Sequence, residues 1–139
     1  MHFAVNYSEP LIKLLLTGKA EVDLLKLPAW PDLVEKAVNI APCYIHFPLN
    51  VGNGFGDAYN TENRAKVDWD FIEGLMKQTN TPIVNVHLSP WLEFNPDVVN
   101  DPFNEETYAR MYEQTVRDLE GVIKRWGKDT VIAENPFPD

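Results

Sequence analysis

Two histidines and one glutamate each end a short run of β-branched and aromatic residues, and a proline follows each run. The three residues are His46, His87 and Glu134. Runs of this kind are typical of strands that lead into loops. Two imidazoles and a carboxylate together suit a divalent ion such as zinc, manganese or iron(II), whereas calcium and magnesium prefer oxygen ligands. The residue types therefore predict a metal site, provided that the three strand ends meet.

The elements between these residues alternate in a way that would make the strand ends meet. The expected order is a strand at 3–7, a helix at 9–16, a strand at 21–27, a helix from Pro31, the strand ending at His46, a helix after Asp68, the strand ending at His87, a helix at 104–126 and the strand ending at Glu134. Long loops are expected at 48–66 and 89–103. Alternation of strands and helices predicts a parallel α/β sheet, open or closed, whose carboxyl ends share one edge where ligands collect.

Each of the three residues also has an ordinary structural interpretation. A single histidine is most often a core or loop residue, and Glu134 alone could be an ion-pair partner or a helix cap. Their matching positions at the ends of parallel strands favour a functional site over these alternatives.

Further polar and aromatic residues follow the predicted strand ends and are candidate substrate contacts. They are Asn6, Tyr7, Ser89, Trp91 and Asn135. Turn formation explains the polar ones equally well, because Asn and Ser are common turn residues. Trp91 could cover a substrate or anchor its own loop.

Composition narrows the class of protein. The chain has 139 residues, 45% of them hydrophobic, which suits one domain with a single core. Its net charge of −9 and the lack of a basic cluster disfavour nucleic acid as a partner. No run approaches the ~20 apolar residues of a membrane span, and no basic segment marks a signal peptide. The single cysteine, Cys43, excludes an internal disulfide and reads as a core residue, so a cytoplasmic location is expected.

The strand ends resemble those of the xylose isomerase-like TIM-barrel superfamily. The resemblance rests on Tyr44-Ile45-His46, on Val84-Asn85-Val86-His87 and on the Glu-Asn pair that ends 131–135. That superfamily includes sugar phosphate isomerases and epimerases and the endonuclease IV type of nuclease. The resemblance implies parallel βα repeats of a (β/α)8 barrel, with about five of the eight strands present. Residues 1–139 would then be the N-terminal portion of one barrel domain. It also implies that His46, His87 and Glu134 bind metal and that Glu134 acts as the catalytic acid or base.

The function implied by this resemblance is that of a divalent-metal-dependent isomerase or epimerase. Its substrate would be a small sugar or sugar phosphate, with proton transfer through an enediolate. One alternative is phosphodiester hydrolysis of the endonuclease IV type, which the net charge disfavours. Another is an inactive, truncated barrel that only binds or assembles, completed by a missing C-terminal segment or by a second copy. Metal-dependent oxidation of a peptide, found in a related barrel family, is a further possibility.

Overall fold

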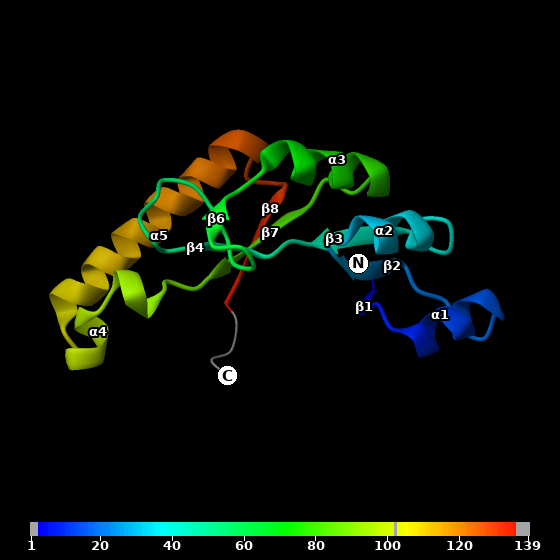
Figure 1. The fold of residues 1–139 in the computed structure, drawn as a ribbon, viewed down its shortest axis with the longest axis horizontal. Helices are drawn as coiled ribbons and strands as arrows, with labels where there is room; N and C mark the ends of the chain where they lie inside the picture. The colour runs from blue at the N-terminus through cyan, green and yellow to red at the C-terminus, as the bar shows by residue number, and fades with distance from the viewer. Residues whose placement is uncertain (1–2, 102, 136–139) are drawn as a thin grey trace. The chain divides into compact units, whose positions relative to one another are not determined.

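The computed structural model describes residues 3–101 and 103–135, and these residues form two units. The first unit comprises residues up to 47 together with 68–83, and the second comprises 48–67 and the residues from 84 onward. The chain therefore leaves the first unit, returns to it for one helix, and leaves it again (Figure 1).

The first unit is a three-stranded parallel sheet with three helices. Its strands are β1 (Ala4–Asn6), β2 (Leu24–Pro28) and β3 (Cys43–His46), paired in the order β1-β2-β3. Its helices are α1 (Glu9–Leu16), α2 (Pro31–Ala37) and α3 (Trp69–Thr79). Leu25 and Leu27 on the central strand β2 are fully buried, and Ile45 on β3 is almost fully buried.

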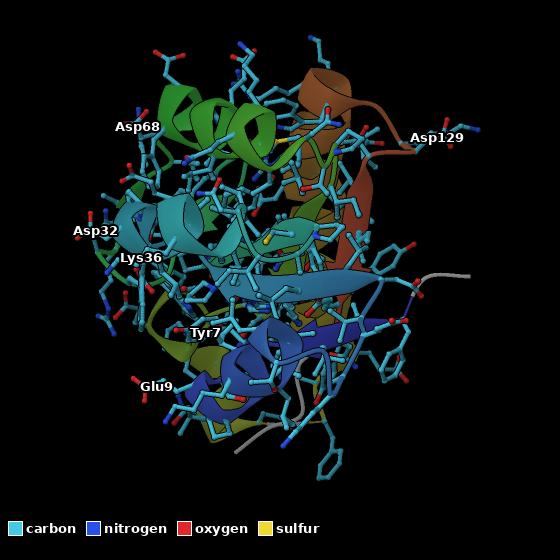
Figure 2. All side chains as sticks on the ribbon, turned by 90° about the vertical axis from the view of Figure 1, so that its right-hand side faces the viewer. Tyr7, Glu9, Asp32, Lys36, Asp68 and Asp129 are labelled. Atoms are coloured by element: carbon cyan, nitrogen blue, oxygen red, sulfur yellow. The ribbon has the colours of Figure 1, made fainter. Side chains whose placement is uncertain are left out.

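Local sequence signals explain where these helices begin and which side they bury. The Ser8 hydroxyl accepts a hydrogen bond from the Leu11 amide, and the Asp68 carboxylate accepts one from the Phe71 amide. Both are N-caps that satisfy an otherwise unpaired helix donor. Helix α2 buries Val34 and Ala37, whereas its charged residues Asp32 and Lys36 are exposed (Figure 2).

The second unit is a five-stranded mixed sheet with two α-helices. Its strands are β4 (Leu49–Val51), β5 (Tyr59–Asn60), β6 (Ala65–Lys66), β7 (Val84–Leu88) and β8 (Val131–Glu134), paired in the order β6-β5-β4-β7-β8. Strands β4, β7 and β8 are parallel, whereas β5 and β6 are antiparallel to their neighbours. The helices are α4 (Asp97–Asn100) and α5 (Glu105–Trp126), preceded by a 3-10 turn at Leu92–Phe94.

The expectation of parallel βα repeats from a (β/α)8 barrel is wrong. Within residues 3–101 and 103–135 the strands form two sheets, one parallel and one mixed, and no closed barrel. The segment 48–66, expected to be a loop, contains β4 and the antiparallel pair β5–β6. Pro48 stands between β3 and β4, and a proline has no N–H with which to continue a strand ladder.

Candidate metal centre

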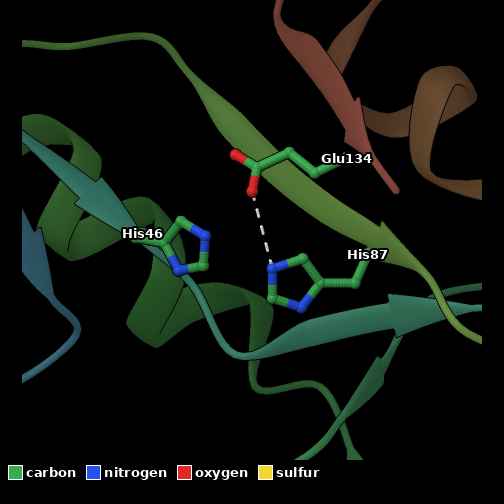
Figure 3. A group of neighbouring side chains, drawn as sticks. All are labelled: His46, His87 and Glu134. Atoms are coloured by element: carbon green, nitrogen blue, oxygen red, sulfur yellow. Dashed lines mark ion pairs between the residues drawn. The ribbon is translucent and has the colours of Figure 1, made fainter. Parts of the chain in front are cut away.

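His87 and Glu134 form a side-chain pair across two adjacent parallel strands of the second unit. The register of β7 and β8 pairs His87 with Glu134, which places both side chains on one face of the sheet. The His87 Nε2 and Glu134 Oε2 atoms are 3.6 Å apart (Figure 3). Their side chains are 24% and 34% exposed, so an ion and a substrate could reach them.

The spacing of this pair fits two ligands of one metal ion. Zinc binds imidazole nitrogen and carboxylate oxygen at about 2 Å, so two ligand atoms on a tetrahedral ion lie roughly 3.3 Å apart. The observed 3.6 Å requires little adjustment. The same contact agrees with the alternative interpretation of Glu134, in which it is an ion-pair partner and binds no metal.

Asn50 is the residue on the other side of His87, and sequence reasoning did not find it. Strand β4 pairs Asn50 with His87, so Asn50, His87 and Glu134 lie in one row across the sheet. Asn50 is fully buried, and its Nδ2 donates to the Ser89 carbonyl at 2.8 Å. A buried amide needs such partners to offset its lost hydration. The apolar-polar-apolar order of Leu49, Asn50 and Val51 was the available signal.

His46 is the final residue of β3 in the first unit, where it is paired with Pro28 of β2. It is half-buried. The predicted position at the carboxyl end of a parallel strand is therefore confirmed for His46, as it is for Glu134. His87 is the penultimate residue of its strand.

The candidate substrate contacts are distributed over both units. Asn6 ends β1 in the first unit and is exposed. Tyr7 follows it and is half-buried (Figure 2), and its amide donates to the Lys26 carbonyl. In the second unit Ser89 follows β7, and its amide donates to the Val51 carbonyl. Asn135 follows β8 and is exposed.

Trp91 belongs to a cluster of aromatic rings in the second unit. Its ring lies 5.2 Å from that of Tyr59 and 5.7 Å from that of Phe94, centroid to centroid, and the Arg64 guanidinium lies 5.5 Å from the Trp91 centroid. Phe55 completes the cluster at 4.9 Å from Tyr59. These contacts fit the interpretation that Trp91 anchors its segment, and the alternative that it covers a substrate stays a prediction.

A buried carboxylate on α5 organises the loop that follows β4. The backbone amides of Gly52, Asn53 and Gly54 donate to Asp118 Oδ2 at 2.9–3.0 Å, and the Gly56 amide donates to Oδ1 at 2.6 Å. All three glycines have positive φ, which turns successive amides toward one anion. Residues 52–56 read Gly-x-Gly-x-Gly, and the anion that the amides of this stretch bind is an aspartate of the same chain.

Comparisons with protein-family models, with curated proteins and with solved structures give no significant match. None of the helices in the described part of the chain has the length and apolar character that a membrane span requires.

Proposed function

We propose that this chain binds a divalent metal ion through His87 and Glu134, with His46 as the third ligand. The observation that supports the proposal most directly is the 3.6 Å spacing of the His87 and Glu134 ligand atoms. His46, His87 and Glu134 are also a set whose side chains are chemically suited to hold one ion.

The ligand set favours zinc, manganese or iron(II). Neutral imidazole and carboxylate together suit these ions, and three protein ligands leave coordination positions open to water or substrate. An ion with open positions is the arrangement of catalytic rather than structural metal sites. This supports a metal-dependent enzyme over a purely structural metal site.

The reaction proposed for this centre is isomerisation or epimerisation of a small sugar or sugar phosphate. A bound divalent ion polarises a carbonyl oxygen and so acidifies the neighbouring C–H group. Glu134 is the carboxylate at the centre and would transfer the proton. Ser89, Trp91 and Asn135 follow β7 and β8 and are the proposed substrate contacts in the second unit, together with Asn6 and Tyr7 of the first. The net charge of −9 disfavours a polyanionic substrate such as DNA. The single cysteine suits the reducing cytoplasm as the site of action.

The metal proposal is tested by titrating the purified, metal-free chain with Zn²⁺ and Mn²⁺ in a calorimeter. We expect one ion per chain, and at least tenfold weaker binding for His87→Ala and for Glu134→Gln. Glu93→Gln is the matched control, because Glu93 is also a partly exposed glutamate, in an ion pair with Arg64 at 3.1 Å. A folded chain that binds no ion, or a Glu93→Gln variant as impaired as Glu134→Gln, contradicts the proposal.

His46 is tested separately because it belongs to the first unit. If it is the third ligand, His46→Ala weakens metal binding as much as His87→Ala does. An unchanged affinity in His46→Ala would leave a two-residue site and remove His46 from the proposal.

The reaction is tested by proton exchange. The metal-loaded chain is incubated with aldoses, ketoses and their phosphates in D₂O, and deuterium incorporation next to the carbonyl is followed by NMR. We expect incorporation that is lost in Glu134→Gln. Metal binding without any exchange across the panel would reject the sugar isomerase proposal while leaving the metal site intact.

A further inference from the structure

Asn53 makes hydrogen bonds to three different parts of the second unit. Its backbone amide donates to Asp118 of α5 at 2.9 Å, its Nδ2 donates to Asn50 Oδ1 of β4 at 3.4 Å, and its Oδ1 accepts from the Trp91 amide at 2.8 Å. Asn53 as a whole residue is 7% exposed. An asparagine can fill this position because its amide carries a donor and an acceptor on one planar group.

The three contacts connect the row that contains His87 with the segment that contains Trp91. Asn50 is the in-register neighbour of His87, and it donates to the carbonyl of Ser89, two residues after His87. Asn53 adds the next connection, to Trp91. The backbone of Trp91 is fixed on its other side as well, since its carbonyl accepts from Asn95 Nδ2 at 3.1 Å.

The loop that carries Asn53 is itself held in place by Asp118. Gly52 and Gly54, on either side of Asn53, donate to the same carboxylate oxygen as the Asn53 amide does. A Cβ added at Gly52 would lie 3.0 Å from the Thr115 hydroxyl and 3.1 Å from Pro90. The loop therefore has little freedom to shift, and Asn53 presents its side chain from a fixed backbone.

We infer that Asn53 is a positioning residue, which holds Trp91 at the carboxyl end of β7, four residues beyond His87. This inference rests on the proposed function, in which Trp91 is a substrate contact beside the metal ion. Asn53 touches neither ion nor substrate. Its effect passes through the hydrogen bond from the Trp91 amide to Asn53 Oδ1.

The first test needs no metal and measures hydrogen exchange of the Trp91 amide by NMR. We expect this amide to be protected in the unmodified chain, because it donates to Asn53 Oδ1 at 2.8 Å. Asn53→Ala removes the acceptor and speeds its exchange by about tenfold, whereas Asn53→Asp keeps an acceptor oxygen and retains the protection. Asn63→Ala is the matched control, because Asn63 Oδ1 accepts from the Ala65 amide at 3.1 Å elsewhere in the same unit. An unprotected Trp91 amide in the unmodified chain, or protection that survives in Asn53→Ala, overturns the inference.

The second test relates Trp91 to the metal. Co²⁺ is bound in place of Zn²⁺, and the Trp91 share of the tryptophan fluorescence, obtained by difference from Trp91→Phe, is measured with and without the ion. We expect Co²⁺ to quench this share in the unmodified chain and in Asn53→Asp, and to quench it at most half as much in Asn53→Ala, at unchanged Co²⁺ affinity. Equal quenching in all three overturns the inference. A chain that binds no Co²⁺ rejects the proposed function instead, and the exchange experiment still decides the role of Asn53.

Discussion

At the scale of single residues, burial distinguishes potentially reactive side chains that a ligand can reach from those that it cannot reach. His87 and Glu134 keep 24% and 34% of their side chains exposed and can meet a ligand. Cys43 is only 1% exposed, and its thiol donates to the Ala41 carbonyl at 3.0 Å. Desolvation by burial raises the pKa of this thiol from 9.0 to about 11. The prediction that Cys43 is a core residue rather than a nucleophile agrees with its burial.

The raised pKa predicts a thiol that resists alkylation. At pH 8 a thiol of pKa about 11 is ionised in roughly one molecule in a thousand, and only the thiolate attacks. Iodoacetamide should therefore modify folded Cys43 at least ~100-fold more slowly than the same residue in concentrated urea, as followed by intact mass. Because the pKa is raised on folding, its contribution to stability is complete below pH 9.0 and is lost as the pH rises through about 11. Equal alkylation rates in the two conditions would contradict the burial of Cys43.

At the scale of elements, helix α5 is fitted against the loop that follows β4. Asp118 binds four amides of this loop, and Gly121, one turn further along the helix, lets the loop backbone approach. A Cβ at Gly121 would overlap the Gly56 carbonyl oxygen and lie 2.9 Å from the Gly56 carbonyl carbon. Gly74 in α3 has nothing within 4 Å of the same position. Gly121 therefore allows a close backbone contact that a side chain would block, whereas a side chain at Gly74 would meet no neighbouring atom.

This difference predicts opposite effects of the same substitution. Alanine is a better helix former than glycine by about 1 kcal/mol, so Gly74→Ala should raise the free energy of unfolding by about that amount. Gly121→Ala gains the same propensity but must push the loop backbone away, so it should lower the free energy of unfolding by roughly 2 kcal/mol. Urea unfolding of both variants measures the two effects. A stabilised Gly121→Ala would show that the loop does not pack on α5 as described.

Capped and long elements could be predicted from the sequence, whereas very short ones could not. Helix α1 was predicted at its observed bounds because Ser8 caps it and Gly18 follows its end, and α5 because a long apolar face runs along it. Strands β5 and β6 have two residues each, too few to show any periodicity. Their pairing depends on a turn, in which Asn60 Oδ1 accepts from the Glu62 amide. Because β5 and β6 were not predicted, the sequence indicated only parallel strands, and a parallel barrel was expected where the structure has a mixed sheet.

Only part of the candidate site could be predicted from the sequence. His87 and Glu134 could be paired from the sequence because each lies at the end of a run that forms a parallel strand, and such ends share an edge. Asn50 and Asn53 were missed because both lie in the segment that was expected to be a loop, although the apolar-polar-apolar order of residues 49–51 indicated a short strand there. Their roles depend on contacts with residues such as Ser89 and Trp91, which are distant in sequence, and no local pattern specifies such contacts.

At the scale of the whole molecule, the proposed metal ion should stabilise the folded chain. His87 and Glu134 meet only when β7 and β8 pair, so the unfolded chain does not offer the site. A ligand that binds only the folded state stabilises it by about 2.7 kcal/mol when present at 100 times its Kd. Mn²⁺ is the better probe, because the imidazoles and the thiol of the unfolded chain bind it more weakly than they bind Zn²⁺. We therefore expect the urea midpoint to rise when Mn²⁺ is added.

The variants Glu134→Gln and Glu93→Gln distinguish specific metal binding from general charge screening as the cause of a rise in the urea midpoint. The chain carries 21 acidic residues and a net charge of −9, so a divalent cation could stabilise it simply by screening repulsion. Such screening would act equally on Glu134→Gln and Glu93→Gln, since each removes one carboxylate. Specific binding predicts that Glu93→Gln keeps the full Mn²⁺-dependent rise and that Glu134→Gln loses it. Equal rises in both variants would assign the stabilisation to screening and remove this support for a metal centre at β7 and β8.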